Sequence, residues 1–290
     1  MLASRGVGQT FDVAEVVVLG SGSPIPDPGR AGSALAVVSD REWMLVDCGR
    51  AATQRAIDTG LDLTSVVAVA ITHHHSDHVS DLATFATTRW IAGATTPLTV
   101  VAPDGPAAVF AERCLEAFDD QSFHAQASPA VGPRPVIHVR RFEAAHEVLV
   151  VLESGGWRLA SVLVDHHPIE PAVGYHVEHD GVRVAVSGDT AVCDGMRTLA
   201  QNVDVLVHQA LLSDRVSPAL LKWNAGARAV GELAARTHPQ TLVLTHLIPG
   251  PTGAQDEDAY RHEVRSGGFD GPTLIAHDGL RVSINPTTST

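Results

Sequence analysis

Short apolar runs recur along the chain and alternate with segments whose apolar residues follow helical spacing. The runs predict strands, which lie at residues 15–19, 33–38, 43–47, 66–71, 98–101, 136–141, 148–152, 158–165, 173–178, 182–187, 204–208, 241–245, 273–276 and 280–284. The helical patterns lie at residues 50–59, 79–91, 105–118, 194–200, 217–236 and 255–266. Strands interleaved with amphipathic helices fit an α/β fold of two packed sheets covered by helices, the αββα sandwich.

The chain carries no mark of a division into domains. Its 290 residues are many for one domain, but no Ser/Gly-rich linker or charge block interrupts them. We therefore expect a single domain over residues 1–290, with an irregular excursion near 120–135. No apolar run approaches the roughly 20 residues that a membrane span needs, so we expect no membrane partner.

The most informative segment reads Thr-His-His-His-Ser-Asp-His at residues 72–78, directly after the apolar run at 66–71. A histidine-rich surface loop or a purification tag could give similar letters, but neither would follow a buried strand inside the chain. Imidazole and carboxylate ligands suit zinc, manganese or iron. The segment therefore predicts a metal site built from four side chains, those of His73, His75, Asp77 and His78.

This motif resembles the metallo-β-lactamase superfamily, whose further ligands stand at the ends of later strands. Three such strand ends follow in the required order, at Asp165-His166-His167, Ser187-Gly188-Asp189-Thr190 and Thr245-His246. Because His166 and His167 are adjacent, only one can face the metals. The family pattern Val-Asp-His favours His166, and His167 would then point into the pocket or toward the opposite wall.

The resemblance implies a four-layer αββα metallo-β-lactamase sandwich with a binuclear metal centre. One ion would be held by His73, His75 and His166, the other by Asp77, His78 and His246, with Asp189 between them. Two divalent ions are implied, with zinc favoured over manganese or iron. They would make a hydroxide available at neutral pH as the nucleophile.

Further motifs resemble the branch that holds ribonuclease Z and the zinc arylsulfatases. They are Val18 to Pro24, Pro26 to Gly32, Val46-Asp47-Cys48-Gly49, Pro171 to Tyr175, Ser187 to Thr190 and Val207-His208-Gln209-Ala210. The match runs from about residue 15 to about 284. The branch has His-Glu-Ala where this chain has His208-Gln209-Ala210, and a His-Ser/Thr pair where it has Trp223-Asn224.

The resemblance assigns catalytic roles to the metal ligand Asp77 and to His208, a candidate proton donor. Gln209 cannot ionise, so it can orient His208 but cannot raise its basicity. Asp47 is either a second-shell partner of a ligand histidine or a turn-forming residue. Candidate substrate contacts are His167, Arg89, Trp90 and Trp223.

The charge of the chain argues against a nucleic-acid partner. Its formal net charge is −13, and Lys222 is its only lysine. Aromatic residues, which stack on bases in nucleic-acid binders, make up 4%. The segment between Tyr175 and Gly188 is also too short for the tRNA-gripping arm of ribonuclease Z.

These observations predict a metal-dependent hydrolase of a small-molecule ester, most plausibly a phosphodiester or a sulfate ester. A lactonase or other carboxylic-ester hydrolase is the alternative. We rank a tRNA 3′ processing endonuclease and a catalytically silent metal-binding protein below these. Three cysteines without paired spacing indicate a reducing compartment, hence a cytoplasmic protein. A homodimer is left open.

Overall fold

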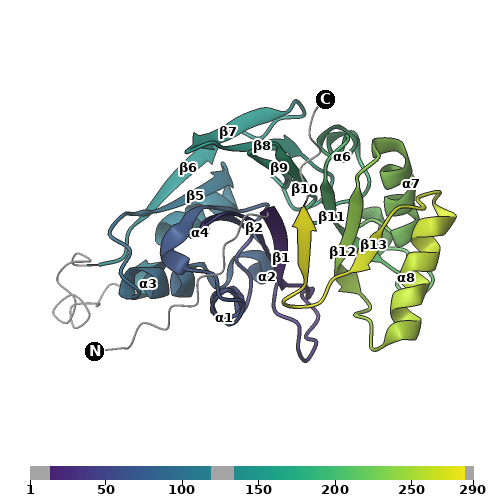
Figure 1. The fold of residues 1–290 in the computed structure, drawn as a ribbon, viewed down its shortest axis with the longest axis horizontal. Helices are drawn as coiled ribbons and strands as arrows, with labels where there is room; N and C mark the ends of the chain where they lie inside the picture. Colours follow the sequence, from purple (N-terminus) through teal and green to yellow (C-terminus); the bar gives the residue numbers. More distant parts are fainter. Residues whose placement is uncertain (1–13, 119–133, 285–290) are drawn as a thin grey trace.

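The computed structural model describes residues 14–118 and 134–284, and it confirms the predicted sandwich of two sheets between helical layers (Figure 1). The first sheet has seven strands in the order β14 (Arg281–Ile284), β1 (Ala14–Gly20), β2 (Ala34–Ser39), β3 (Glu42–Val46), β4 (Val66–Ala70), β5 (Leu98–Pro103) and β6 (Ile137–Phe142). The second also has seven, in the order β13 (Thr273–Ile275), β12 (Thr241–Ile248), β11 (Val205–Leu211), β10 (Val182–Val186), β9 (Val173–His179), β8 (Trp157–Leu163) and β7 (Leu149–Ser154).

Helices cover the outer faces of both sheets, as Figure 1 shows. On the first sheet lie α1 (Ala52–Asp58), α3 (Leu82–Ile91) and α4 (Pro106–Arg113), with α2 (Ser76–Val79) at its end. On the second lie α6 (Asp194–Leu199), α7 (Ala227–Thr237) and α8 (Ala254–Ser266). Short 3-10 turns are η1 (Leu63–Ser65), η2 (Glu116–Phe118) and η4 (Leu220–Lys222).

The strands are apolar on both faces because each face packs against another layer. In β1, Val16 and Val18 point into the layer between the sheets, whereas Val17 and Leu19 point toward the helices. Side chains in a strand alternate between the two faces, so a strand covered on both sides needs apolar residues at every position. This arrangement leaves the strand ends and their loops to carry polar side chains.

Two predicted helices differ from the structure. The helix expected at 79–91 is broken into α2 and α3, and the helix expected at 217–236 begins only at Ala227, with Gly226 as its N-cap. Residues 217–226 instead form η4 and a loop, because Pro218 lies in this segment and Gly226 ends it with extended backbone. Most of the excursion expected at 120–135 lies outside the described residues.

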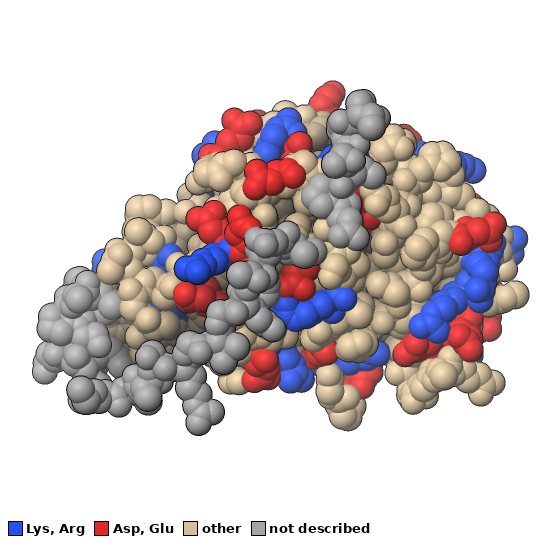
Figure 2. Space-filling view, viewed as in Figure 1, with Lys and Arg blue, Asp and Glu red and all other residues tan. Residues whose placement is uncertain are grey.

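Within the described residues, the search for a membrane-spanning segment finds no helix with the length and apolar character required. On the face in Figure 2, acidic and basic side chains are interspersed among uncharged residues. The strongly negative net charge therefore does not translate into a uniformly acidic surface on this face.

Candidate metal centre

The segment after β4 positions the first four predicted ligands. β4 ends at Ala70, and His73 follows with its side chain fully buried. The chain then enters the single turn of α2, which buries both Asp77 and His78. A helical turn places neighbouring residues around one axis, so these two side chains can approach a second position beside that of His73.

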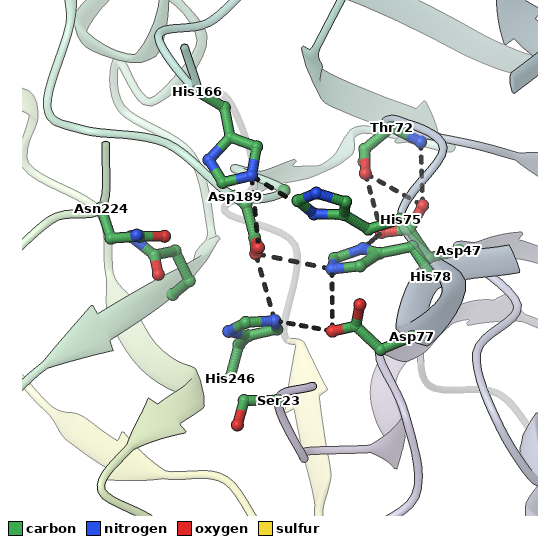
Figure 3. Close-up of polar contacts among 12 residues, drawn as sticks. Ser23, Asp47, Thr72, His75, Asp77, His78, His166, Asp189, Asn224 and His246 are labelled. Atoms are coloured by element: carbon green, nitrogen blue, oxygen red, sulfur yellow. Dashed lines mark hydrogen bonds and ion pairs between the residues drawn. The ribbon is translucent and has the colours of Figure 1, made fainter. Parts of the chain in front are cut away.

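The seven predicted ligands form two neighbouring groups. Figure 3 labels six of them, His75, Asp77, His78, His166, Asp189 and His246, and shows their side chains pointing toward one another. One group has ligand atoms within 4.8 Å of one another and comprises His73, His75, His166 and Asp189. The other, by the same measure, comprises Asp77, His78 and His246. The additional residues come from the ends of β8, β10 and β12, which bring distant parts of the sequence together.

Asp189 lies between the two groups, as a bridging ligand would. Its Oδ1 atom is 3.5 Å from Nε2 of His78 and 3.4 Å from Nε2 of His246. Its Oδ2 atom is 3.8 Å from Nε2 of His166, in the other group. Each carboxylate oxygen of Asp189 therefore faces a different group.

The protonation of the cluster suits divalent metal ions. Burial would raise the pKa of Asp189, but the imidazoles of His246 and His78 outweigh it and hold that pKa well below its usual range. Burial also lowers the pKa of His73, which keeps its ring neutral. Nε2 of His78 and Oδ1 of Asp189 are buried with no hydrogen bond to satisfy either one. Burial would lower the pKa of His78 and of His246, but the neighbouring carboxylates outweigh it and raise both pKa values, so these two rings would release their protons when an ion binds. Anionic oxygen, imidazole and unsatisfied buried atoms together are what a site for zinc or a similar ion requires.

The structure separates the two adjacent histidines after β8. His166 is buried, and its Nδ1 atom lies 3.1 Å from the backbone carbonyl of Trp223. The side chain of His167 is 67% exposed and lies 3.4 Å from Glu170. The position of His166 agrees with the family pattern. The carbonyl of Trp223 can accept a hydrogen bond from the Nδ1–H of His166, which leaves Nε2 unprotonated and free to bind a metal.

Asp47 serves in both roles considered for it. Its backbone has φ 60°, as in a turn, and its carboxylate accepts hydrogen bonds from the Thr72 backbone N–H at 2.8 Å and from Nδ1 of His78 at 2.7 Å. The Thr72 hydroxyl lies 3.0 Å from Asp47 and 3.0 Å from Nδ1 of His73. Sequence reasoning missed Thr72, although its place directly before His73 was a signal.

The structure does not bring His208 to the cluster. Along β11, Val205 and Val207 face the layer between the sheets, whereas Leu206 and Ala210 pack toward the helices. Alternation therefore turns His208 toward the helices, where it is fully buried and where burial lowers its pKa to about 4. Proton donation by His208 stays a prediction, and this position does not support it.

Gln209 occupies the face of β11 that borders the metal ligands. It lines a small cavity together with Asp189 and His246. Its Nε2 atom donates to the backbone carbonyl of Thr190 at 2.8 Å, which fixes the amide beside the bridging carboxylate. The side chain thus fastens the loop that carries Asp189.

The remaining predicted substrate contacts lie in different places. Arg89 and Trp90 are buried at the end of α3, and the Arg89 guanidinium donates to the carbonyl of Thr96 at 2.7 Å. Both line a pocket that none of the seven clustered residues borders. Trp223 lies next to the cluster through its carbonyl. A contact of His167, Arg89, Trp90 or Trp223 with substrate stays a prediction.

Comparisons with known proteins place the chain in a family. Residues 42–247 match the family described as a beta-lactamase superfamily domain. Ribonuclease Z of Mycobacterium bovis (strain BCG / Pasteur 1173P2) is 32% identical over 283 residues, covering 94% of this chain and 99% of the relative. Ribonuclease Z of Mycolicibacterium paratuberculosis is 34% identical over 281 residues, covering 93% and 98%.

Solved structures agree on the fold. The metallo-beta-lactamase fold protein YhfI from Bacillus subtilis has a TM-score of 0.72 at 19% identity, covering 94% of this chain and all of that protein. Human tRNase Z, short form, has a TM-score of 0.69 at 19% identity, covering 93% of this chain and 99% of that one. At such identities the likeness concerns the fold alone.

The relatives correct two predictions made from the sequence. Because proteins about one-third identical over nearly the whole chain are named Ribonuclease Z, the ranking of small esters above RNA was wrong. The expectation of a small-molecule substrate and no nucleic-acid partner was wrong for the same reason. Net charge is a sum over the whole chain, whereas affinity for RNA depends on local phosphate contacts and on the charge of bound metal ions.

The absence of a long tRNA-gripping arm between Tyr175 and Gly188 was also a poor reason to exclude an RNA substrate. The segment from Tyr175 to Gly188 is a tight hairpin of β9 and β10. The Mycobacterium bovis relative is nevertheless matched over 99% of its length, which leaves no room for a long unmatched arm in it.

The family match over residues 42–247 and the relatives that are about one-third identical over nearly the whole chain give the same result. The chain belongs to the metallo-β-lactamase superfamily, in the branch that holds ribonuclease Z, and is a metal-dependent hydrolase.

Proposed function

We propose that this protein is an endonuclease that hydrolyses a phosphodiester bond of RNA, with the 3′ extension of a precursor tRNA as its substrate. The observation that carries the proposal is the convergence of all seven predicted ligands in a chain 32% identical to a Ribonuclease Z over 94% of its length.

Two sets of residues would each hold one metal ion. We propose that His73, His75 and His166 hold one ion, that Asp77, His78 and His246 hold a second, and that Asp189 joins them. Zinc is our first choice, with manganese or iron as alternatives. When bound, such ions supply a hydroxide at neutral pH and neutralise charge on the phosphate oxygens.

The chain's own groups prepare this site at neutral pH. Burial would raise the pKa of Asp77, but its hydrogen bond from His246 and the neighbouring imidazoles outweigh that effect and lower it. Asp77 and Asp189 therefore stay anionic and can bind cations without first losing a proton. The Asp77 carboxylate lies 3.1 Å from Nε2 of His246, so both present their ligand atoms to the same position.

Asp77 is thus proposed as a catalytic residue through its place in the metal centre. Gln209 cannot donate a proton as a carboxylic acid would. In our proposal it keeps the Asp189 loop in place through its hydrogen bond to Thr190. This positioning needs no ionisable side chain, so the exchange of Glu for Gln is compatible with hydrolysis.

The proposal is tested with a precursor tRNA that carries a 3′ extension. Zinc-loaded protein should cut it into two fragments at one position, and Asp189→Ala should abolish the cut. Asp194→Ala is the control, because that carboxylate lies five residues further along the chain, at the start of α6, and is 92% exposed. A protein that hydrolyses bis(p-nitrophenyl) phosphate but leaves the precursor intact would refute the proposal.

Three further expectations stay proposals. We propose that the chain is a single domain, since both sheets contribute ligands to one cluster. The three cysteines are free, which suits a reducing compartment such as the cytoplasm. Assembly into a homodimer is testable by light scattering.

A further inference from the structure

A pocket of about 500 Å³ lies beside the metal centre. Three segments form it: the loop at residues 22–30, residues 215–220 up to the start of η4, and residues 247–252 at and after the end of β12. Much of its wall is aliphatic or proline, from Ile25, Pro26, Leu220, Leu247, Ile248 and Pro249. Its volume falls within the range of about 300 to 1,000 Å³ that is common for small-molecule sites. We call it the proline pocket.

The proline pocket lies beside one predicted ligand, His246, although none of the seven ligands lines it. Leu247, in its wall, follows the ligand His246 in the chain. Ser23, also in its wall, lies beside His246 in Figure 3. The backbone N–H of His246 donates to the carbonyl of Ser21 at 3.2 Å, which ties the loop at 22–30 to the metal centre. A substrate whose phosphate is held at the metals can therefore extend past His246 toward this pocket.

We infer that the proline pocket binds the base of a nucleotide next to the scissile phosphate. The inference rests on the proposed function, and it names the part of the substrate that the enzyme recognises beyond the phosphate. A base offers two apolar faces and a polar edge. Proline and aliphatic side chains can cover the faces, and hydroxyl groups can bind the edge.

Two serines supply that polar edge. Ser23 is only 4% exposed, and its hydroxyl oxygen accepts a hydrogen bond from the backbone N–H of Ile25 at 3.3 Å. The hydroxyl oxygen of Ser217 accepts in the same way from Ala219 at 3.3 Å. Both hydroxyl protons remain available to donate to a base, because each serine is engaged only as an acceptor.

The charge of the lining residues favours the proline pocket over a second large pocket near the metal ligands. A pocket of about 830 Å³ borders Asp165, next to His166, and four further carboxylates line it, those of Asp104, Glu143, Glu170 and Asp194. Neither arginine nor lysine is among its described lining residues. Such a surface repels a ligand that carries phosphate.

The proline pocket has a different balance of charge. Arg30 and Arg215 line it together with a single carboxylate, that of Asp27. Arg215 is paired with Asp256 at 2.7 Å but its side chain remains 39% exposed, so it can meet a phosphate at the rim. Arg30 is paired with Asp27 at 3.4 Å, so the proline pocket is close to neutral with one exposed arginine at its rim, whereas the charged side chains described around the other pocket are all carboxylates. The proline pocket is therefore the better of the two for a nucleotide.

Binding of small ligands to the zinc-loaded protein tests the inference without any RNA cleavage. Isothermal titration with AMP, CMP and ribose 5-phosphate compares ligands that share the phosphate and differ in the base. We expect at least one nucleotide to bind about ten-fold tighter than ribose 5-phosphate, because the aliphatic and proline wall removes the apolar faces of the base from water. Equal affinity for all three ligands would overturn the inference.

Filling the pocket should remove only the preference for a base. In Val216→Phe the added ring enters the pocket, so AMP and CMP should bind no more than about two-fold tighter than ribose 5-phosphate, whose own affinity stays unchanged. Val109→Phe is the control, because Val109 lies on α4 and is 41% exposed. Ser217→Phe, at an exposed rim position, replaces Val216→Phe if that variant fails to fold.

Two outcomes contradict the inference, and a third contradicts only the proposed function. A ten-fold preference that survives both pocket variants, or an equal loss of affinity for all three ligands at unchanged zinc content, would place base binding elsewhere. A protein that shows the predicted preference yet leaves precursor tRNA uncut would refute the proposed function and keep the pocket.

Discussion

The carboxylate of Asp47 lies 2.7 Å from Nδ1 of His78, and the same carboxylate binds the Thr72 hydroxyl that faces Nδ1 of His73. One buried side chain therefore orients a proposed ligand in each group of the metal centre, directly in one case and through a hydroxyl in the other. Such outer partners fix the orientation of a ligand ring and strengthen its binding to metal.

Asp47→Asn should weaken zinc binding by about 10- to 100-fold, the usual effect of removing an outer-shell carboxylate. Asparagine tolerates the positive φ of this position, so the backbone should be retained. Affinity is measured by competition with a chromophoric chelator. The control is Asp58→Asn, at an exposed site on α1, which should bind zinc as the wild type does. Unchanged zinc affinity in Asp47→Asn would show that Asp47 does not orient the ligands.

Thr72→Val should lower zinc affinity about ten-fold because it removes the hydroxyl between Asp47 and His73. Thr72→Ser keeps the hydroxyl and should restore most of the affinity. The two variants differ little in size, so the comparison isolates the hydrogen bond. Equal zinc affinity in the two would mean that this hydroxyl orients nothing.

His208→Leu should make the protein less sensitive to acid. Burial lowers the pKa of His208 to about 4, so between pH 6.5 and 4 the unfolded chain binds a proton that the folded chain does not. Stability is therefore lost as pH falls through this window, by about 2 kcal/mol between pH 7 and 5. Urea unfolding of metal-free protein should show a loss smaller by that amount in the variant, whereas an unchanged pH dependence would contradict the burial of a neutral ring.

The same variant separates packing from proton donation. A proton donor would lose about 10² to 10⁴ in rate on RNA when replaced. Since His208 faces the helical layer, we expect His208→Leu to cleave precursor tRNA within about ten-fold of the wild-type rate once folded. A loss of a thousand-fold, at unchanged zinc content, would show that His208 reaches the substrate.

The sequence could predict the cluster of proposed ligands because its signals are local. Each proposed ligand lies in or just after the end of a strand, and four stand within residues 73–78. The carbonyl of Trp223, which orients His166, could not be predicted, because a backbone acceptor has no residue-type signature. The alternation of side chains along β11 could have predicted that His208 points away from the layer that Val207 faces. The resemblance to the family motif instead suggested that His208 is a proton donor.

The fold was predictable for a related reason, and the substrate was not. Short runs of apolar residues predict strands regardless of which neighbouring strand each one pairs with. The late start of α7 was harder, because apolar residues continue through residues 217–226 while Pro218 and Gly226 interrupt the helix. Recognition of RNA depends on which charges the fold gathers at one place, and net charge does not carry that information.

The most direct test of the central claim is the rate of precursor tRNA cleavage as zinc is added to metal-free protein. Two three-residue groups with a shared carboxylate predict a rate that rises from near zero and levels off close to two equivalents of zinc per chain. Cleavage at full rate without metal, or no cleavage at any amount of zinc, manganese or iron, would contradict the account.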